Sequence, residues 1–559
     1  SCQDGETCVG GGCYGKPPSL KFAAELLPPS TSHELARTEL PWLDIATDGL
    51  LPHVAFAASI QVSGRVALSN DPSGSVAAKI EFRRASRIPG GPDYVVAVDA
   101  RPATLANGQS FLVRLPPCEP GESFQVTIYP DDGGIESRTD GLPSPAELAP
   151  PLRNEGVITT DMTDIVYLLG DPSGLKRIQG RIVTAVHLGV AGMMVRAYGS
   201  FVDGSPRELA SSLGRTDDTG SFVLWVPISW ADVFDIVATP EAAGLRPTLT
   251  RRGVVVEDPI GLLVVTRSIG DLELPSYPNP VQVSLPVVGE SSAGGLSPAV
   301  GAKVTFRTTL AAEPDPTTFE ATGVVAADGE ARLLVIPAGT DGNRSYAVDV
   351  VPPAASMHAS AWHEAIEVGP LGGTLTPLVL APRVYVTGRV LDAAGDVVTG
   401  LLMRARPSSR NQLDLSAEET AVLLGIDWPM SSVGDDGRFA IFLDPLVLGH
   451  PTIYDLELQP PASSPVPNWS FDRISLPTAA GAAPVDLGER RIPAATIARG
   501  TVIDPAGVPI AGAELRVFVI ESTGTCGKAE TPTCEPPARL NTLAKTASDG
   551  TFLLVLPSP

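Results

Sequence analysis

The stretch DGTFLLVLP, residues Asp549–Pro557, predicts a tight turn followed by a β-strand. Gly550 supplies the positive φ that such a turn needs at low steric cost. Phe552, Leu554 and Leu556 then fall on one face of the strand, because side chains alternate at a period of two. The two residues between them are also apolar, so we expect this strand to lie inside a packed sheet.

Weaker copies of this stretch recur along the chain, each with a glycine that precedes an apolar run ending near a proline. The glycines are Gly108, Gly220, Gly329, Gly437 and Gly550. Their spacing is 112, 109, 108 and 113 residues in turn, which predicts a small domain repeated about five times.

Two other patterns keep the same period. The first is an alternating strand that opens on an aromatic residue and ends in proline. Its copies are Phe22–Pro29, Phe124–Pro130, Phe234–Pro240, Tyr346–Pro353 and Tyr454–Pro461. The second is a short glycine-led strand, with copies at Gly64, Gly180, Gly388 and Gly500. Together the three patterns predict a tandem array of all-β domains.

The composition narrows the function classes. The chain has 559 residues, and its 55 glycines and 55 prolines suit many turns and short strands. The formal net charge of −23 argues against binding to nucleic acid or to anionic membranes, since both need a basic face. No apolar run reaches the length of about 18 residues that a spanning helix needs, so the sequence predicts no transmembrane segment.

The N-terminal segment is rich in cysteine, with Cys2, Cys8 and Cys13 close together and few core-forming residues between them. This density predicts a disulfide-stapled head that includes Cys8 and Cys13, and export to an oxidising compartment. The segment resembles the Cys-rich heads of many secreted bacterial surface proteins, in which four cysteines enclose an Asp- and Gly-rich loop. The resemblance implies a further cysteine upstream of Ser1. In an alternative interpretation, Ser1-Cys2 ends a lipobox and Cys2 carries a lipid anchor.

One complete module combines a glycine-led strand, a tight turn and a second alternating strand, as in Gly500–Val517. This pattern resembles the carboxypeptidase regulatory-like domain, a transthyretin-like β-sandwich of about seven strands that recurs in secreted and cell-surface proteins. The resemblance covers most of residues 59–559 and is best in the fourth and fifth modules. In the first and third modules only Ala77–Ile80 and Gly301–Val304 hold the second-strand position. The resemblance implies a scaffold, because the family's module carries no catalytic residues.

These patterns divide the chain into seven segments. They are a Cys-rich head at 1–16, an N-terminal connector with strands at 17–58, β-sandwich 1 at 59–150, β-sandwich 2 with its connector at 151–278, β-sandwich 3 with its connector at 279–382, β-sandwich 4 with its connector at 383–494, and a truncated β-sandwich 5 at 495–559. The whole is predicted to be a rod-like tandem array of about five transthyretin-like or Ig-like β-sandwich modules.

The usual catalytic and metal-binding motifs are not recognisable. His33-Glu34 begins like the zinc-binding helix of a metalloprotease, but Arg37 stands where the second histidine is needed. Neither a Gly-x-Ser-x-Gly elbow nor a phosphate-binding glycine loop is present. Asp217-Asp218 beside a turn suits either calcium or a turn in which the carboxylate bonds its own backbone, and the second interpretation is favoured. The sequence therefore predicts no catalytic residue, no cofactor and no metal.

The variable loops between the second strand and the Asp-Gly strand all leave their modules from the same end. Loops at one end of a rigid sandwich are common binding sites. Trp428 lies in the loop of the fourth module, and Cys526 and Cys534 lie in that of the fifth. We predict a disulfide between Cys526 and Cys534. These residues suit either stiffening of the loops or binding of a surface glycan or peptide.

The fifth module ends at Pro559 without the aromatic-led strand that its sisters carry. Its sheet would then have an unpaired edge. The strand can come from a continuation of the chain, from elsewhere in the same chain, or from a neighbouring molecule. The sequence analysis favours continuation.

The sequence thus predicts an exported, non-enzymatic scaffold or adhesive protein, extracellular or at a bacterial-type cell surface. Its expected partners are a surface glycan or other surface proteins. The alternative is a glycan- or peptide-binding surface protein that uses the loops of the fourth and fifth modules.

Overall fold

The computed structural model describes residues 7–9, 12–14, 20–43, 45, 50–51, 53–69, 71–89, 91, 93–101, 109–130, 149–170, 175–184, 187–200, 207–228, 230, 232–240, 248–256, 266–274, 280–290, 295–310, 317–337, 343–408, 429–447, 450–461, 464–477, 484–521 and 539–558. The regular elements of these residues are all β-strands, so the all-β fold class is confirmed.

The described strands pack around five large hydrophobic cores. We call the units around these cores modules one to five. They comprise 59–170, 175–274, 281–380, 384–491, and 495–557 together with 20–56. In each module the core lies between two sheets, which is the arrangement of a β-sandwich.

Module four shows the plan most simply. Its first sheet has the order β33-β30-β38 and its second the order β32-β31-β36-β37. The strands are β30 (Val384–Leu391), β31 (Leu402–Pro407), β32 (Met430–Ser432), β33 (Arg438–Leu443), β36 (Ile453–Gln459), β37 (Trp469–Ser475) and β38 (Val485–Arg491), with the small ribbon β34 (Leu446–Val447) and β35 (His450–Pro451). The last strand, β38, runs parallel to the first, β30.

Modules one to three repeat this plan. Module one has β6 (Ile60–Leu68), β7 (Ala78–Arg84), β8 (Tyr94–Ala100), β9 (Phe111–Leu115), β10 (Phe124–Pro130), β11 (Leu152–Gly156) and β12 (Met162–Leu169). Module two has β13 (Leu175–Thr184), β14 (Met193–Gly199), β15 (Glu208–Leu209), β16 (Gly214–Arg215), β17 (Ser221–Pro227), β18 (Val233–Pro240), β19 (Thr248–Val255) and β20 (Thr266–Leu274). Module three has β21 (Val281–Glu290), β22 (Leu296–Pro298), β23 (Lys303–Leu310), β24 (Thr317–Val324), β25 (Glu330–Val335), β26 (Arg344–Val351), β27 (Ala361–Val368), β28 (Gly373–Thr374) and β29 (Leu378–Leu380).

Module five is assembled from both ends of the described chain. Its C-terminal strands are β39 (Ala495–Ile503), β40 (Glu514–Glu521), β41 (Arg539–Lys545) and β42 (Thr551–Pro557). Its N-terminal strands are β3 (Leu20–Leu27), β4 (Thr38–Leu40) and β5 (Val54–Ala55). The sheets are β4-β3-β40-β41 and β42-β39-β5. A separate ribbon, β1 (Thr7–Val9) with β2 (Gly12–Tyr14), precedes them.

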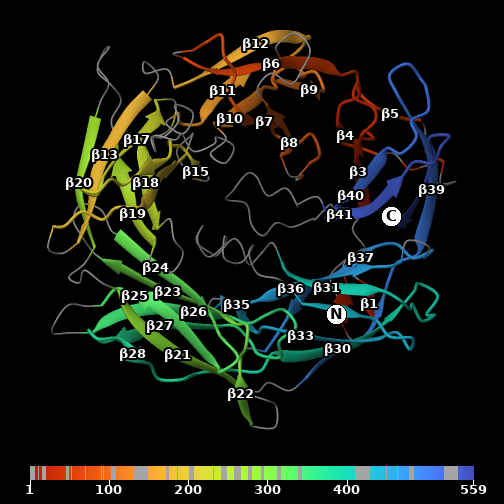
Figure 1. Cartoon of the computed structure of the whole chain (residues 1–559). Helices are drawn as coiled ribbons and strands as arrows, with labels where there is room; N and C mark the ends of the chain where they lie inside the picture. Colours follow the sequence, from red (N-terminus) through yellow and green to blue (C-terminus); the bar gives the residue numbers. More distant parts are fainter. Residues whose placement is uncertain are drawn as a thin grey trace.

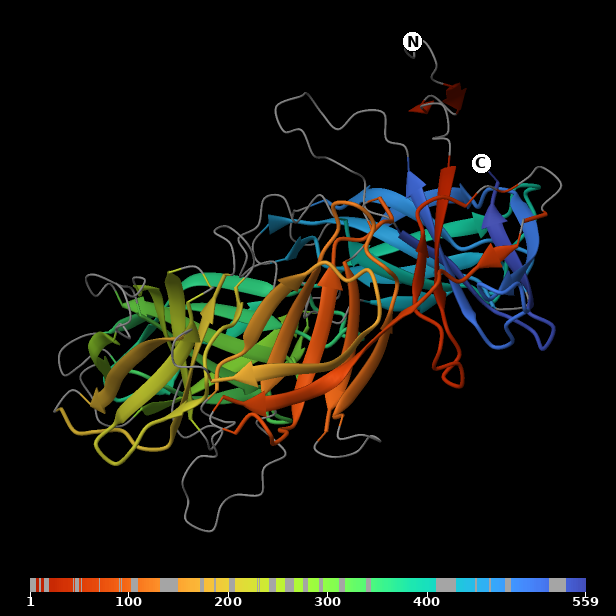
Figure 2. The same ribbon diagram turned by 90° about the horizontal axis from the view of Figure 1, so that it is seen from above.

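The modules follow one another around a closed ring, with β3 beside β40 where the ring closes (Figure 1). The view from above shows the same two strands side by side (Figure 2). The prediction of a rod-like array is therefore wrong. An array whose N-terminal strands β3, β4 and β5 belong to its last module cannot extend as a rod.

The repeated patterns of the sequence were interpreted correctly at the level of strands. The turn glycines Gly220, Gly329, Gly437 and Gly550 all have positive φ, between 76° and 83°. Gly108 lies outside the described residues. Each of these four turns contains an aspartate one to three residues before the glycine, and its carboxylate accepts a hydrogen bond from a backbone N–H of the same turn. Asp549 Oδ1, for example, accepts from Thr551 N at 3.0 Å. These carboxylates therefore serve the turn, as the sequence analysis favoured.

One expectation for the opening stretch is wrong. Phe552, Leu554 and Leu556 are buried as predicted, but Leu553 is 50% exposed. The reason is that, among the described strands, β42 pairs with β39 alone, and one face of its sheet meets the core.

Candidate functional site

The joint that closes the ring begins with β3. This strand pairs antiparallel with β40 over eight residue pairs, from Leu20 with Glu521 to Leu27 with Glu514. In module four, β36 holds the same place against β31. β3 is therefore the aromatic-led strand of module five. Of the three sources considered for this strand, the structure has the second, a strand from elsewhere in the same chain, and not the continuation that the sequence analysis favoured.

The rest of the N-terminal segment completes the same module. β5 runs parallel to β39, as the last strand of every other module runs parallel to the first. Leu51 N donates to Arg499 O and Phe56 N donates to Ile503 O, both at 2.9 Å. We call residues 20–56 the closing segment.

The closing segment also supplies a large part of the core of module five. Phe22, Leu26, Val54 and Phe56 are all buried there, together with residues of β39, β40 and β42. Burying one such side chain stabilises a fold by about 1.5–3 kcal/mol. Module five without its closing segment would therefore lose several such contributions and one side of its core.

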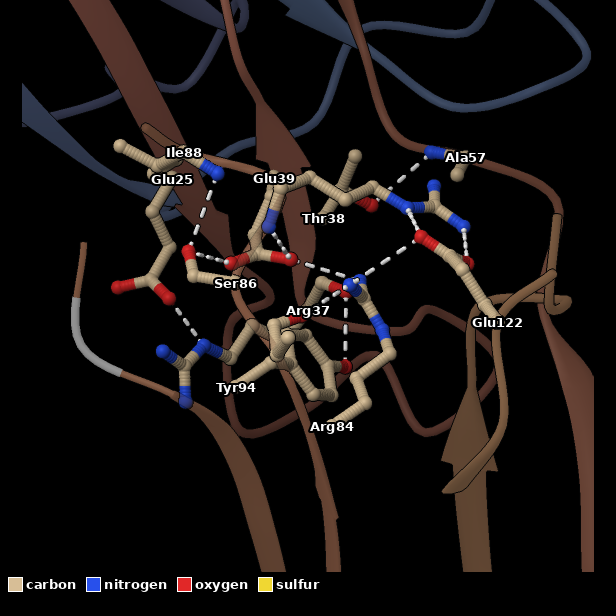
Figure 3. Close-up of polar contacts among 12 residues, drawn as sticks. Glu25, Arg37, Thr38, Glu39, Ala57, Arg84, Ser86, Ile88, Tyr94 and Glu122 are labelled. Carbon is tan, nitrogen blue, oxygen red and sulfur yellow. Dashed lines mark hydrogen bonds and ion pairs between the residues drawn. The ribbon is translucent and has the colours of Figure 1, made fainter. Parts of the chain in front are cut away.

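A buried ion pair fastens the closing segment to module one. The side chains of Glu39 in β4 and Arg84 in β7 are 1% and 2% exposed, and Arg84 Nη2 lies 2.7 Å from Glu39 Oε2 (Figure 3). Ser86 Oγ donates to the other carboxylate oxygen at 2.6 Å. The partners matter, because an ion that is buried without them costs several kcal/mol.

Tyr94 packs between two guanidinium groups beside this pair. The Cζ atoms of Arg84 and Arg37 lie 4.5 and 4.8 Å from its ring centroid, within the range of cation–π attraction. Its hydroxyl donates to Arg37 O at 3.0 Å. Burial raises the pKa of Tyr94 against the opposing effect of the two cations, so the phenol stays a hydrogen-bond donor.

A second ion pair lies at the rim of the joint. Arg87 donates to both carboxylate oxygens of Glu122, from Nε at 2.7 Å and from Nη2 at 2.5 Å, and also to Pro117 O at 3.1 Å. The hydrogen bonds from Arg87 lower the pKa of Glu122 to about 2. The same contact raises the pKa of Arg87. Both residues belong to module one, so this pair fixes the loop that carries Ser86 and Arg87.

Glu25 connects the closing segment to both neighbours. This β3 residue is 2% exposed, and its carboxylate pairs with Arg37 and with Arg516 of β40, the latter at 3.6 Å. Arg37 in turn donates from Nη1 to Val95 O of module one at 2.9 Å. A small apolar cluster of Ala23, Ile88, Phe518 and Ile520 adds contact between the three parts.

The other joints use different contacts. Arg153 of module one pairs with Glu208 of module two and lies 4.6 Å from the ring centroid of Trp230. Between modules two and three, β19 pairs with β24, so that one sheet crosses the joint. Asn468 of module four and Asn541 of module five donate to each other's backbone carbonyl.

The joint between modules three and four resembles the closing joint most. Arg383 and Asp444 are both 6% exposed, and Arg383 Nε lies 2.5 Å from Asp444 Oδ1. Arg383 Nη1 also donates to Ala354 O and Ser356 O, both at 2.7 Å. Ser360 Oγ donates to Asp444 Oδ2 at 2.9 Å.

Sequence reasoning missed the role of the variable segments between the second strand and the Asp-Gly strand. In modules one, three and five this segment contains a further strand, β8, β24 or β41, and in module two it contains β15. Tyr94 of β8, Glu208 of β15 and Asn541 of β41 each contact the preceding module around the ring. β24 pairs with β19, which also belongs to the preceding module. The only signal in the sequence was their alternation, as in Tyr94–Ala100.

The side chains of the predicted site residues are not described. Trp428, Cys526 and Cys534 lie outside the described residues. Cys8 and Cys13 lie opposite each other in the register of β1 and β2, and their side chains are not described. Cys118 is buried and free, and the backbone N–H of Ile158 lies 3.4 Å from its sulfur.

The described part of the chain offers neither a metal site nor a membrane-spanning helix. It contains no group of three or more His, Cys, Asp or Glu residues placed to hold a metal ion. Within the same ranges, no helix has the length and apolar character needed to cross a membrane.

Comparison with protein-family models and with curated proteins finds no match for the chain. The resemblance to the carboxypeptidase regulatory-like domain therefore stays a prediction. The fold and the closing joint together define the class of this protein. It is an all-β protein whose β-sandwich modules form a ring that is closed by the N-terminal segment of the same chain.

Among solved structures, the chain is similar to the Bacillus anthracis TIE protein, at 8% identity and a TM-score of 0.17, over 77% of this chain and 73% of that one. It is similar to a Streptococcal ancillary pilin, at 10% identity and a TM-score of 0.18, over 56% and 99%. It is also similar to the shaft pilin SpaA from Lactobacillus rhamnosus GG, at 12% identity and a TM-score of 0.19, over 38% and 97%. Scores this low carry no argument about function, and the fold assignment rests on the strand pairing described above.

Proposed function

We propose that this chain is a non-enzymatic, exported scaffold or adhesive protein of a cell surface. The closing joint is the observation that carries the proposal. It commits the closing segment, a buried ion pair and a pair of cation–π contacts to holding the first and last modules together. Contacts of this kind fix the relative positions of rigid domains, which is what a scaffold needs.

The acidic surface and the Cys-rich head support the location. A net charge of −23 favours solubility over attachment to anionic surfaces. The three cysteines of the head suit an oxidising compartment. A non-reducing peptide map of protein isolated from its source should show Cys526 linked to Cys534. Free thiols at both positions would argue against export.

The direct test is labelling of intact source cells with a biotin reagent that does not cross membranes. We expect the chain to be labelled on intact cells while a cytosolic protein is not. Labelling of the chain only after lysis would overturn the proposed location. A glycan array with wild-type protein and Trp428→Ala then separates the two proposed functions. Binding that is lost on substitution favours glycan recognition, and no binding by the wild-type protein favours a scaffold.

A further inference from the structure

We propose that module five also accepts the closing segment of a second copy of this chain, so that copies join head to tail by strand exchange. The proposed occupant is residues 20–56 of the other copy. The same sheet edge and the same core serve in both arrangements. This inference goes beyond a surface scaffold, since it specifies how copies would associate.

The position of the covalent connection makes exchange feasible. Within the described residues, the closing segment connects to module one through 57–59, whereas its contacts with β39 and β40 are all noncovalent. A closing segment that leaves its own module five therefore stays attached to its own module one. The ion pair between Glu39 and Arg84 also stays intact, because both residues move together.

An exchanged pair would remake the contacts that opening breaks. The eight residue pairs of β3 with β40, the parallel pairing of β5 with β39 and the ion pair between Glu25 and Arg516 can all form between two chains. The difference between the two forms then lies in chain entropy and in the angles of the joints. A closed ring is favoured in dilute protein, and exchange is favoured where the local concentration is high.

One joint must change its angle, because five joints with the present angles return the chain to its start (Figure 1). The joint between modules four and five is the best candidate. The polar contact described above for this joint is a neutral one, between Asn468 and Asn541, whereas the contact described between modules three and four is a buried charged pair. Neutral hydrogen bonds are weaker than charge-assisted ones.

The test uses a disulfide that can form between chains only after exchange. Ala24 and Val517 are register partners in β3 and β40. One sample carries Ala24→Cys and a second carries Val517→Cys, in full-length protein. The two are mixed at high concentration, warmed and oxidised, and each is also treated alone. Products are separated on a non-reducing gel and by light scattering.

We expect a covalent dimer in the mixture and none in either sample alone, with a yield that rises at least several-fold with protein concentration. No dimer in the mixture would overturn the proposal, as would equal dimer in all three samples, since that would come from the native cysteines. If either variant fails to fold, the pair Leu26→Cys and Leu515→Cys gives a second test at another register position.

Discussion

Modules four and five have the same strand plan but differ in how the plan is connected. In module four, β33 leads through residues 444–452 to the aromatic-led strand β36. In module five, the equivalent strand β3 comes from the other end of the described chain and pairs with β40 in the same way. A β-sheet is specified by register and burial, so it does not require its strands to be consecutive.

The difference has an energetic consequence. In module four 45 residues separate β31 from β36 in the chain, and closing a loop of this length costs less conformational entropy than closing a longer one. In module five the loop is the whole ring, and loop-closure entropy grows with length. The contacts of the closing segment must therefore stabilise module five more than the equivalent contacts need to stabilise module four. The buried apolar side chains that the closing segment adds to the core of module five supply contacts of this kind.

The largest effect should come from placing a charge in the core of module five. We expect Phe22→Asp to release the closing segment, because an isolated carboxylate is not tolerated in an apolar core. Hydrogen exchange should then lose protection over β39, β40 and β42, while β30 and β33 of module four keep theirs. The matched control is Tyr454→Asp, which should unfold module four and leave the protection of β40 largely unchanged. Retained protection of β40 in Phe22→Asp would contradict the role assigned to the closing segment.

The next effect concerns the buried ion pair. Arg84→Met leaves Glu39 without its main partner, which we expect to destabilise the closing joint by about 3 kcal/mol. The double variant Arg84→Met/Glu39→Met should recover much of this loss, because paired apolar side chains carry no desolvation cost.

The stability of the closing joint is measured in both variants by denaturant unfolding, monitored by hydrogen exchange on β3 and β4. Arg383→Met, at the joint between modules three and four, is the comparison and should cost a similar amount locally. A double variant as unstable as Arg84→Met would show that the ion pair itself is not the cause.

The sequence predicted the strands of this fold well and their assembly poorly. The spacing of Gly220 and its sisters identifies the repeat because each turn needs a positive φ, which is a local property. The aromatic-led copy at Phe22–Pro29 was recognised at the right period. The sequence places it in the connector 17–58, because it does not show which sheet edge a strand will join.

The closing joint could not be predicted for a related reason. Glu39 and Arg84 are 45 residues apart in sequence, and each resembles an ordinary surface charge. Only the packing of β4 against module one brings them together and removes water from both. The strands within the variable segments, such as β8 and β24, were not predicted, because the sequence does not show that they continue a sheet or meet the preceding module.

Acid should weaken the rim of the closing joint. The pKa of Glu122 is lowered from 4.5 to about 2 in the folded protein, mainly by its hydrogen bonds from Arg87. A carboxyl group with a lowered folded pKa contributes stability above its unfolded pKa and loses it as the pH falls toward the folded value. We expect a loss of about 1 kcal/mol between about pH 4.5 and pH 2, since the group is partly exposed.

The contribution of Glu122 is tested by measuring the free energy of unfolding of the closing joint across this pH range, in wild-type protein and in Glu122→Gln. The slope of the free energy of unfolding against pH should be smaller in the variant by roughly 0.3 of a proton, averaged over this range. Equal slopes in the two proteins would mean that Glu122 does not contribute to the acid sensitivity.

The smallest effect tests whether the outer face of module five is open to solvent. Leu553 and Leu554 are neighbours on β42, but Leu553 is 50% exposed while Leu554 is 1% exposed in the core. We expect Leu554→Ala to cost about 2–5 kcal/mol and Leu553→Ala to cost less than about 0.5 kcal/mol. Thermal unfolding of the two variants at low protein concentration measures the contrast. Equal costs would mean that something covers Leu553 in solution.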